Sequence, residues 1–462
     1  MAKVIQNKKE GLSLEQKNKT PLLCLVVIFL GLCLQLPFQT INNLPVHQRV
    51  TVGERLNLNL SLPKFLAPHC RYTVDGMQPS NFGLNDITPV AATPGRLDVQ
   101  IKLFGFIPVR HLTVSVVPEI RVIPGGQAIG VMVESEGVMV VGRSVIIDRQ
   151  GRRHNPAAAA GIELGDVLLK VNGIKVETES QVRDLINNLG QAGKPLQMEL
   201  KRRQSRVTYR TTVKPIYCQE TKRYRIGLYV RDGTAGVGTM TFYEPRTKSY
   251  GALGHIISDL DTCQPIELGR GKVMGARIEG IRMGKKGLPG EKMGVFRGDA
   301  DLSGNIIKNT NCGIFGKLTQ EPKNIYRKDA LPVAMAHEIK EGPAEIYTVV
   351  QGEQIEKFNI EIQQVHPQGR SEGKGMIIKI TDPQLLRKTG GIVQGMSGSP
   401  IIQEGKLVGA VTHVFVNDPA RGYGVLAEWM LDDSGILPEQ VSKRNVEKMT
   451  ILALKLGYSL KI

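Results

Sequence analysis

Short runs in which apolar and polar residues alternate, separated by glycine and proline, constrain the fold of this chain most strongly. The stretches Leu56–Leu62 and Leu97–Leu103 both show this period of two. Such alternation is typical of β-strands that bury one face and expose the other. The chain has 462 residues, including 51 Gly and 25 Pro, which is enough for several domains with cores of their own. The sequence therefore predicts a mainly β protein of several domains.

The N-terminus combines a basic segment with an uncharged apolar run. Five lysines in the first twenty residues outnumber Glu10 and Glu15, and Leu22–Leu34 then carries no charge. A positive segment before an apolar run is typical of export signals. No A-x-A cleavage site follows, so we expect a signal-anchor helix over 21–38. Its lysine-rich end should stay in the cytoplasm, with the rest of the chain outside.

Composition and cysteine spacing bear on partners and cofactors. The chain carries 60 Lys plus Arg against 43 Asp plus Glu, a net charge of +17, and eight of these basic residues lie in Leu268–Arg297. We expect this segment to form a long hairpin, since it lacks the interleaved aromatics of a nucleic-acid site. The six Cys form no C-x-x-C pair, and no His stands at metal-ligand spacing. We therefore expect no nucleic-acid partner, no metal, no other cofactor and mostly free thiols.

The stretch Asn155–Gly173 is more specific. It combines an alanine-rich segment, a Gly-Asp strand entry and an Asn-Gly turn, and apolar residues at helical spacing follow it, among them Val182 and Ile186. This pattern resembles a PDZ domain, which we place at 119–217. The resemblance implies a groove in which a peptide adds as an extra strand beside the helix. The residues expected to form this groove are Ile129, Gly130, Val131, Val182 and Ile186.

Two short motifs further along the chain point to chemistry. In Gly395–Pro400, glycines on both sides of Ser397 allow a tight turn that exposes its hydroxyl. The N–H groups of Gly395 and Ser397 can then converge on one oxyanion. A serine hydroxyl needs an imidazole to take its proton, and His255 lies 142 residues upstream, the order found in chymotrypsin-like enzymes. We expect Ser397 as the nucleophile, His255 as the base, and Gly395 and Ser397 as the oxyanion hole.

Three segments carry a resemblance to a known family: Arg231–Thr239, Ala252–Asp259 and Gln394–Pro400. With the order of anchor, β domain, PDZ domain and peptidase, they resemble the stage IV sporulation protein B (SpoIVB) serine peptidases of endospore-forming bacteria. The resemblance covers nearly the whole chain. It implies a chymotrypsin-like double β-barrel and self-cleavage near the anchor.

The same resemblance implies partners and a place in development. Its members cut a protein regulator of an intramembrane protease, which leads to activation of a late sigma factor during endospore formation. The expected partners are protein substrates, including other copies of the chain in trans, and the membrane through the N-terminal anchor. The expected location is the space between forespore and mother cell, with a released form after self-cleavage.

The third member of the triad is the hardest to assign. The resemblance places it on Asp382, fifteen residues before Ser397, in an Asp-Pro sequence at a strand end. The usual order in chymotrypsin-like chains instead favours an acid between the two barrels. The alternatives are Asp299, Asp301 and Asp259 for the acid, and His413, expected in the pocket wall, as a second candidate for the base.

The leading prediction is a membrane-tethered serine endopeptidase with a PDZ domain. The alternative is an exported adaptor in which the PDZ domain and the barrels bind partners without chemistry. The expected parts are a cytoplasmic basic segment (1–20), the signal-anchor (21–38), a small β domain (45–118), the PDZ domain (119–217), the peptidase (218–440) and a C-terminal tail (441–462).

Overall fold

The computed structural model describes residues 46–54, 69–74, 82–83, 90–91, 94–202, 207–259, 261–298, 302–366, 374–437 and 451–452. It divides the chain into two units, residues 1–119 with 438–462, and residues 120–437. The expected signal-anchor at 21–38 and the expected strand at Leu56–Leu62 lie outside the described residues. Within the ranges above, no helix is long and apolar enough to cross a membrane.

The first unit contains a five-stranded β-sheet. In order across the sheet, its strands are β1 (His47–Thr51), β6 (Ile107–Val117), β5 (Gly95–Leu103), β2 (Cys70–Val74) and β3 (Phe82–Gly83). Buried and accessible residues alternate along β5, which confirms the strand expected at Leu97–Leu103. A separate pair joins β4 (Val90–Ala91) to β31 (Ile451–Leu452).

The PDZ part of the second unit is built around helix α4 (Glu179–Gln191). Thr178 caps this helix by accepting a hydrogen bond from the Gln181 N–H. Val182 and Ile186 on its inner face belong to the buried core of this part. The other elements here are β9 (Ile146–Ile147), β10 (Arg153–His154), α3 (Pro156–Ala159), β11 (Val167–Val171), β12 (Ile174–Lys175), β13 (Leu196–Lys201), β14 (Thr208–Val213), β15 (Ile216–Cys218) and β16 (Arg223–Arg225).

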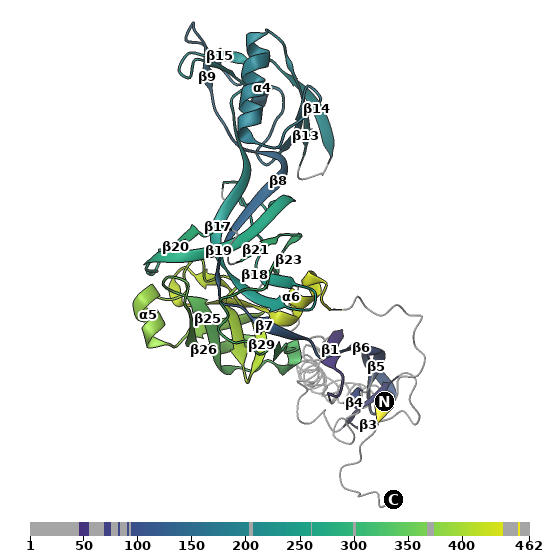
Figure 1. The fold of residues 1–462 in the computed structure, drawn as a ribbon. Helices are drawn as coiled ribbons and strands as arrows, with labels where there is room; N and C mark the ends of the chain where they lie inside the picture. Colours follow the sequence, from purple (N-terminus) through teal and green to yellow (C-terminus); the bar gives the residue numbers. More distant parts are fainter. Residues whose placement is uncertain are drawn as a thin grey trace, which may run out of the picture. The chain divides into compact units, whose positions relative to one another are not determined.

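Two long strands, β8 (Ala128–Arg143) and β17 (Leu228–Glu244), run from the PDZ part into the part that the sequence predicts as a peptidase, here called the peptidase part (Figure 1). They pair antiparallel along most of their length. At its far end β8 pairs with β11 of the PDZ part, and nearer its start it pairs with β19 (Leu268–Arg282) of the peptidase part. The two parts therefore share one continuous sheet.

The first half of the peptidase is an open half-barrel. Its sheet is not closed, and two of its strands, β8 and β17, continue into the PDZ part. Strands β19 and β20 (Glu291–Phe296) pair as the hairpin expected at Leu268–Arg297. The remaining strands are β7 (Arg121–Pro124), β18 (Ser249–Ala252), β21 (Ser303–Asn305), β22 (Lys308–Thr310), β23 (Gly313–Lys317) and β24 (Leu331–Pro332).

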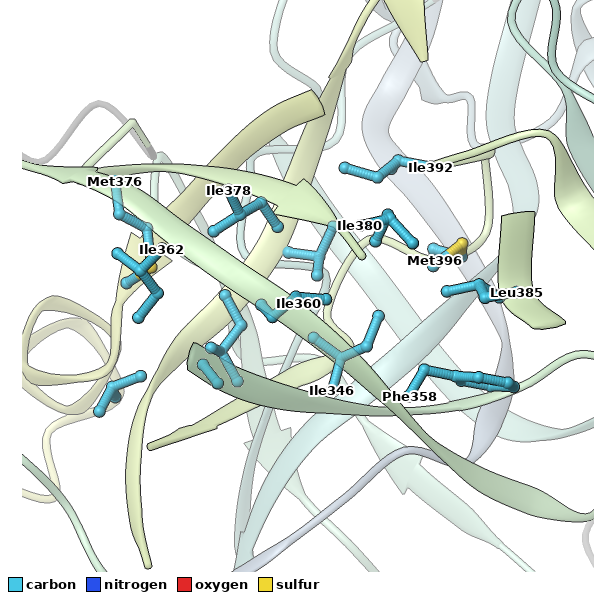
Figure 2. Close-up of a cluster of buried hydrophobic side chains, with 14 of the residues drawn as sticks. Ile346, Phe358, Ile360, Ile362, Met376, Ile378, Ile380, Leu385, Ile392 and Met396 are labelled. Carbon is cyan, nitrogen blue, oxygen red and sulfur yellow. The ribbon is translucent and has the colours of Figure 1, made fainter. Parts of the chain in front are cut away.

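The second half is a closed six-stranded barrel. Around the barrel the strands are β25 (Gly342–Val349), β26 (Ile355–Val365), β27 (Met376–Ile380), β30 (Asp418–Leu426), β29 (Lys406–Phe415) and β28 (Pro400–Gln403). Aliphatic side chains fill its interior, together with Leu385 of helix α5 (Pro383–Thr389) and Met396 (Figure 2). Two further helices, η2 (Ala336–Glu338) and α6 (Ala427–Ser434), complete the unit. Of the expected pair of barrels, the second is closed and the first is open.

Candidate active site

The turn that carries Ser397, here called the nucleophile turn (Gln394–Ser399), depends on two glycines. Gly395 has a φ of +92° and Gly398 a φ of +94°, a backbone region that other residues rarely adopt. A Cβ at Gly398 would lie 2.0 Å from the carbonyl oxygen of Thr239, so only glycine fits there. Met396 is fully buried in the barrel core and anchors the turn, while Ser397 stays half-buried.

Strand β17 of the half-barrel holds the nucleophile turn from the other side. Thr239 Oγ1 donates a 2.8 Å hydrogen bond to the Gly395 carbonyl, and the Thr239 N–H donates a 3.0 Å bond to the Ser397 carbonyl. Thr241 Oγ1 donates a 2.8 Å bond to the Gly398 carbonyl. Both threonine side chains are fully buried. The turn directly precedes a strand of the closed barrel, β28, and is held by hydrogen bonds from β17 of the half-barrel. It therefore lies at the junction of the two.

The backbone of the turn leaves two N–H groups available. Among the described residues, no acceptor takes a hydrogen bond from the N–H of Gly395 or of Ser397. The Ser397 hydroxyl donates a 2.6 Å bond to the Thr412 carbonyl. Two unpaired N–H groups flanking a serine are what an oxyanion hole requires.

The segment that carries His255 packs against Thr412, the residue whose carbonyl accepts from Ser397. The residue before His255, Gly254, has a φ of +72°, and a Cβ there would lie 2.8 Å from Thr412 Cγ2, so the chain approaches closely. His255 Nδ1 lies 2.9 Å from the Ile256 carbonyl. A carbonyl only accepts, which assigns the ring proton to Nδ1 and leaves a lone pair on Nε2. Burial lowers the pKa of His255 below its usual range, so the ring is neutral at neutral pH.

His413, the second candidate base, lies next to His255 and directly follows Thr412. The two ring centroids are 5.0 Å apart. Desolvation and the neighbouring His255 both lower the pKa of His413. The site therefore holds two neutral imidazoles beside one serine.

Asp382, the expected acid of the triad, lies at the start of α5 and not against His255. Its Oδ1 accepts hydrogen bonds from the N–H groups of Gln384 (2.9 Å) and Leu385 (3.1 Å), and its Oδ2 from that of Asn359 (3.3 Å). With Pro383 at the first helical position, this is a helix N-cap. Among the described residues, no carboxylate contacts His255. Ser397 and the Gly254–His255 segment both lie against Thr412, whereas Asp382 caps α5.

The alternative acids are also not seen beside His255. Asp259 is buried, and its Oδ2 pairs with Arg231 at 3.0 Å. Its Oδ1 accepts from the N–H groups of Asp261 and Thr262. Asp299 and Asp301 lie outside the described residues.

The strand side of the predicted PDZ groove is corrected by the structure. Ile129, Gly130 and Val131 lie in the middle of β8, where β17 pairs with one edge and β19 with the other. A Cβ at Gly130 would lie 2.5 Å from the Phe296 ring, so this position is packed from the side as well. No edge remains there for a peptide. The prediction failed because the two strands that fill these edges begin about a hundred residues or more later in the sequence.

The PDZ part has its groove elsewhere. A groove of about 760 Å³ lies between α4 and the first residues of β17. Val182 and Ile186 line its helix side, and Leu228–Arg231 line its strand side. This part of β17 pairs with β8 on one edge and has no strand partner on the other among the described residues. An unpaired strand edge beside an apolar helix face is the geometry that peptide addition requires.

Three side chains that contact the nucleophile turn, those of Thr239, Thr241 and Lys292, carry no sequence signal of that role. Thr239 is the last residue of the motif Arg231–Thr239. Thr241 lies two residues further along the same strand. Their side chains therefore share one face of β17, but nothing in the sequence shows what that face touches. Lys292 is one of eight basic residues in Leu268–Arg297, and its burial separates it from the other seven only in the structure.

Parts of the chain are similar to solved protease structures and to the structure of HBP. The inactive form of the Rv3671c protease is 12% identical over 44% of this chain and 85% of that one, with a TM-score of 0.26. The active form, from M. tuberculosis, is 13% identical over 44% and 75%, also with a TM-score of 0.26. HBP is 11% identical over 42% and 82%, with a TM-score of 0.24. No curated protein sequence matches the chain.

The half-barrel and the barrel, with a Gly-Met-Ser-Gly turn at their junction, are the fold and site of a serine endopeptidase, and they are joined to a PDZ domain. Residues 222–431 match the model of the SpoIVB peptidase S55 family. Residues 147–202 match the model of the PDZ domain.

Proposed function

We propose that the chain is an exported, membrane-tethered serine endopeptidase in which Ser397 is the nucleophile and His255 the general base. One observation carries these roles. The nucleophile turn is held from both sides, presents two unpaired N–H groups, and stands beside a neutral imidazole whose Nε2 lone pair is available. Nucleophile, base and oxyanion donors are then present without any further group.

The proposed reaction begins with proton transfer from Ser397 Oγ to His255 Nε2 as the oxygen attacks the substrate carbonyl. The hydroxyl first leaves the Thr412 carbonyl by rotation about its Cα–Cβ bond, a small rotamer change. The N–H groups of Gly395 and Ser397 receive the oxyanion. His255 then gives the proton to the leaving amine, and water releases the acyl group by the same steps in reverse.

The third residue of the mechanism is open to a direct test. Asp382 as the acid requires that its carboxylate leave the cap of α5 and reach His255 Nδ1, which now faces the Ile256 carbonyl. The Ile256 carbonyl can itself fix the tautomer of His255, so a two-residue mechanism needs no acid. The variant Asp382→Asn separates the two cases, because asparagine can cap α5 but cannot act as the acid.

The finer part of the proposal concerns substrates and location. We propose that the enzyme cleaves itself in trans near its N-terminal anchor and cuts a protein regulator of an intramembrane protease. This would take place between forespore and mother cell and activate a late sigma factor. The family of residues 222–431 and the export pattern of the first 38 residues support it. The groove between α4 and Leu228–Arg231 supports capture of peptide segments.

The test of the enzymatic core is labelling of the full-length protein with a serine-directed fluorophosphonate. Wild type should be labelled, Ser397→Ala should not, and His255→Ala should react far more slowly. Ser180→Ala, on the exposed surface of α4, is the matched control and should label as wild type does. Failure of the wild type to label, with partner binding intact, would favour the adaptor without catalysis.

Self-cleavage is tested in the producing cells. Wild-type protein should lose its N-terminal segment with time, and Ser397→Ala should accumulate at full length. Adding active enzyme to the Ser397→Ala protein should restore the shortened form if cleavage acts in trans. Identical fragment patterns for the two proteins would exclude self-cleavage.

A further inference from the structure

Lys292 is a buried lysine that the proposed reaction does not use. It lies on β20 and is 5% exposed. In the described part of the chain no carboxylate pairs with it, and burial lowers its pKa to about 7. Its ammonium donates a 2.7 Å hydrogen bond to Thr348 Oγ1, on β25 of the closed barrel. Burying an unpaired amine is costly, so an amine kept here calls for a reason.

The side chain of Lys292 packs directly against the nucleophile turn. A Cβ at Gly395 would lie 3.0 Å from Lys292 Cβ and 3.2 Å from its Cδ. The Lys292 N–H also donates a 2.9 Å bond to the Gln394 carbonyl. Both the backbone and the stem of Lys292 therefore touch the turn just before Ser397.

The ammonium reaches the far side of the same turn through two hydroxyls. Thr348 Oγ1 lies 3.0 Å from Ser399 Oγ, and Ser399 Oγ donates a 2.7 Å bond to the Met396 carbonyl. A hydroxyl has one hydrogen to give. Ser399 Oγ shares its hydrogen between the Met396 carbonyl and Thr348 Oγ1, so the Thr348 oxygen accepts from both Ser399 and Lys292. The three side chains form one connected network that includes the Met396 carbonyl.

These two contacts fix the peptide planes on which the oxyanion hole depends. In a trans peptide the C=O and the next N–H point in opposite directions. Holding the Gln394 carbonyl toward β20 thus turns the Gly395 N–H away from β20. Holding the Met396 carbonyl toward Ser399 likewise turns the Ser397 N–H away from Ser399. Lys292 acts on the first plane through its backbone and on the second through its ammonium.

We propose that Lys292 is a positioning residue that orients the two N–H groups of the oxyanion hole through Thr348 and Ser399. It touches neither substrate nor the reacting atoms. The proposal rests on the proposed function, since it assumes that these N–H groups receive the oxyanion. The bond to Thr348 persists whether the amine is charged or neutral, because both forms carry N–H donors.

The test compares Lys292→Met with the control Lys286→Met in the full-length protein. Methionine keeps the unbranched stem against Gly395 and removes only the amine, whereas Lys286 is an exposed lysine of the same hairpin. Lys292→Met should lower kcat for a peptide substrate by about 10- to 100-fold and leave KM nearly unchanged. Affinity for a peptide boronic acid, whose adduct with Ser397 places an oxygen in the oxyanion hole, should fall by the same factor. Lys286→Met should match wild type in both.

Two further variants keep the test decisive if Lys292→Met does not fold. Thr348→Val removes the hydroxyl that joins Lys292 to Ser399 and should lower kcat and boronate affinity in the same way. Thr348→Ser keeps the hydroxyl and should match wild type in both. Normal boronate affinity per folded molecule in Lys292→Met or Thr348→Val would overturn the proposal. The hydrogen bonds among Lys292, Thr348 and Ser399 would then contribute to stability only. Absence of hydrolysis and boronate binding in wild type would instead overturn the proposed function itself, and this proposal with it.

Discussion

At the scale of single residues, the neutral state of His255 decides the pH range of the reaction. Burial lowers the pKa of His255 below its ordinary value of about 6.5. The ring then keeps its Nε2 lone pair at pH values where an exposed histidine is already protonated. We predict that the acid limb of kcat/KM has its midpoint below pH 6.5.

The measurement is a pH-rate profile on a peptide substrate, with the profile of His413→Asn beside it. His413→Asn removes the neighbouring imidazole but not the base, so it should keep a limb below pH 6.5. The same shift predicts that the free energy of unfolding falls as the pH drops below 6.5, because the unfolded chain binds a proton that the folded chain lacks. A limb above pH 6.5 would contradict the assignment of His255 as the base.

Residue identities were predictable where a short motif needs particular side chains. The glycines around Ser397 and the Gly-His pair at His255 suggested these positions without any knowledge of the fold. The burial of Lys292 could not be predicted, because the sequence of a basic hairpin does not distinguish a buried lysine from an exposed one. Its contacts with Thr348 and Gly395 are evident only in the structure. Asp382 followed from family spacing, whereas the Asp-Pro pair is equally a sequence for a helix N-cap.

At the scale of single elements, α5 provides a clean test of Asp382. Asparagine caps helices about as well as aspartate, while alanine costs roughly 1 kcal/mol at an N-cap. We predict that Asp382→Ala lowers the free energy of unfolding by about that amount, whereas Asp382→Asn leaves it nearly unchanged. If Asp382 only caps α5, Asp382→Asn also keeps kcat/KM.

The measurement is chemical denaturation together with kcat/KM for both variants. A stable Asp382→Asn protein whose kcat/KM falls by several orders of magnitude would show that the carboxylate is needed in the reaction. That result would require α5 or His255 to rearrange during catalysis.

Strand β17 provides the second test at this scale. Thr239→Val removes the side-chain donor to the Gly395 carbonyl, and Thr241→Val removes the donor to the Gly398 carbonyl. Each leaves a buried carbonyl short of a partner, so we predict a loss of about 1–3 kcal/mol in the free energy of unfolding and a lower kcat. Thr234→Val, on the same strand outside the turn, is the control for both measurements. Variants as stable and active as this control would show that the hydrogen bonds from Thr239 and Thr241 do not hold the nucleophile turn.

The strands themselves show what sequence can predict about elements. The period of two located β5, and the local stretch Asn155–Gly173 located the PDZ part, because both signals lie within one short segment. The pairing of β8 with β17 and β19 joins segments far apart in sequence. No local pattern indicates such pairing, so the sequence alone predicts a free edge at Ile129–Val131 where the structure has two partner strands.

At the scale of the whole second unit, one strand, β17, contains both the groove residues Leu228–Arg231 and Thr239, which hydrogen-bonds the nucleophile turn. We predict that a charge in the groove reduces cleavage of protein substrates and spares cleavage of short peptides. Tyr229 is 52% exposed and lines the groove, so Tyr229→Glu changes the groove with little effect on the core. Leu164→Glu, at an equally exposed PDZ position outside the groove lining, is the control.

The comparison is the rate of trans cleavage of the Ser397→Ala protein against the rate on a short peptide. Tyr229→Glu should slow the first by roughly tenfold, about 1.4 kcal/mol of lost binding, and leave the second unchanged. Equal rates for Tyr229→Glu and Leu164→Glu on the protein substrate would mean that the groove takes no part in substrate capture.

The pairing of Ser397 with His255 is the central claim, and the most direct test is kcat/KM for wild type, Ser397→Ala, His255→Ala and the double variant. When two residues act together in one step, removing either one already abolishes that step. Each single change should therefore lower kcat/KM at least about a thousandfold, and the double change should lower it little further. The free energy of unfolding of all four proteins should stay close to that of wild type. Near-normal turnover in His255→Ala, or losses that multiply in the double variant, would contradict the account.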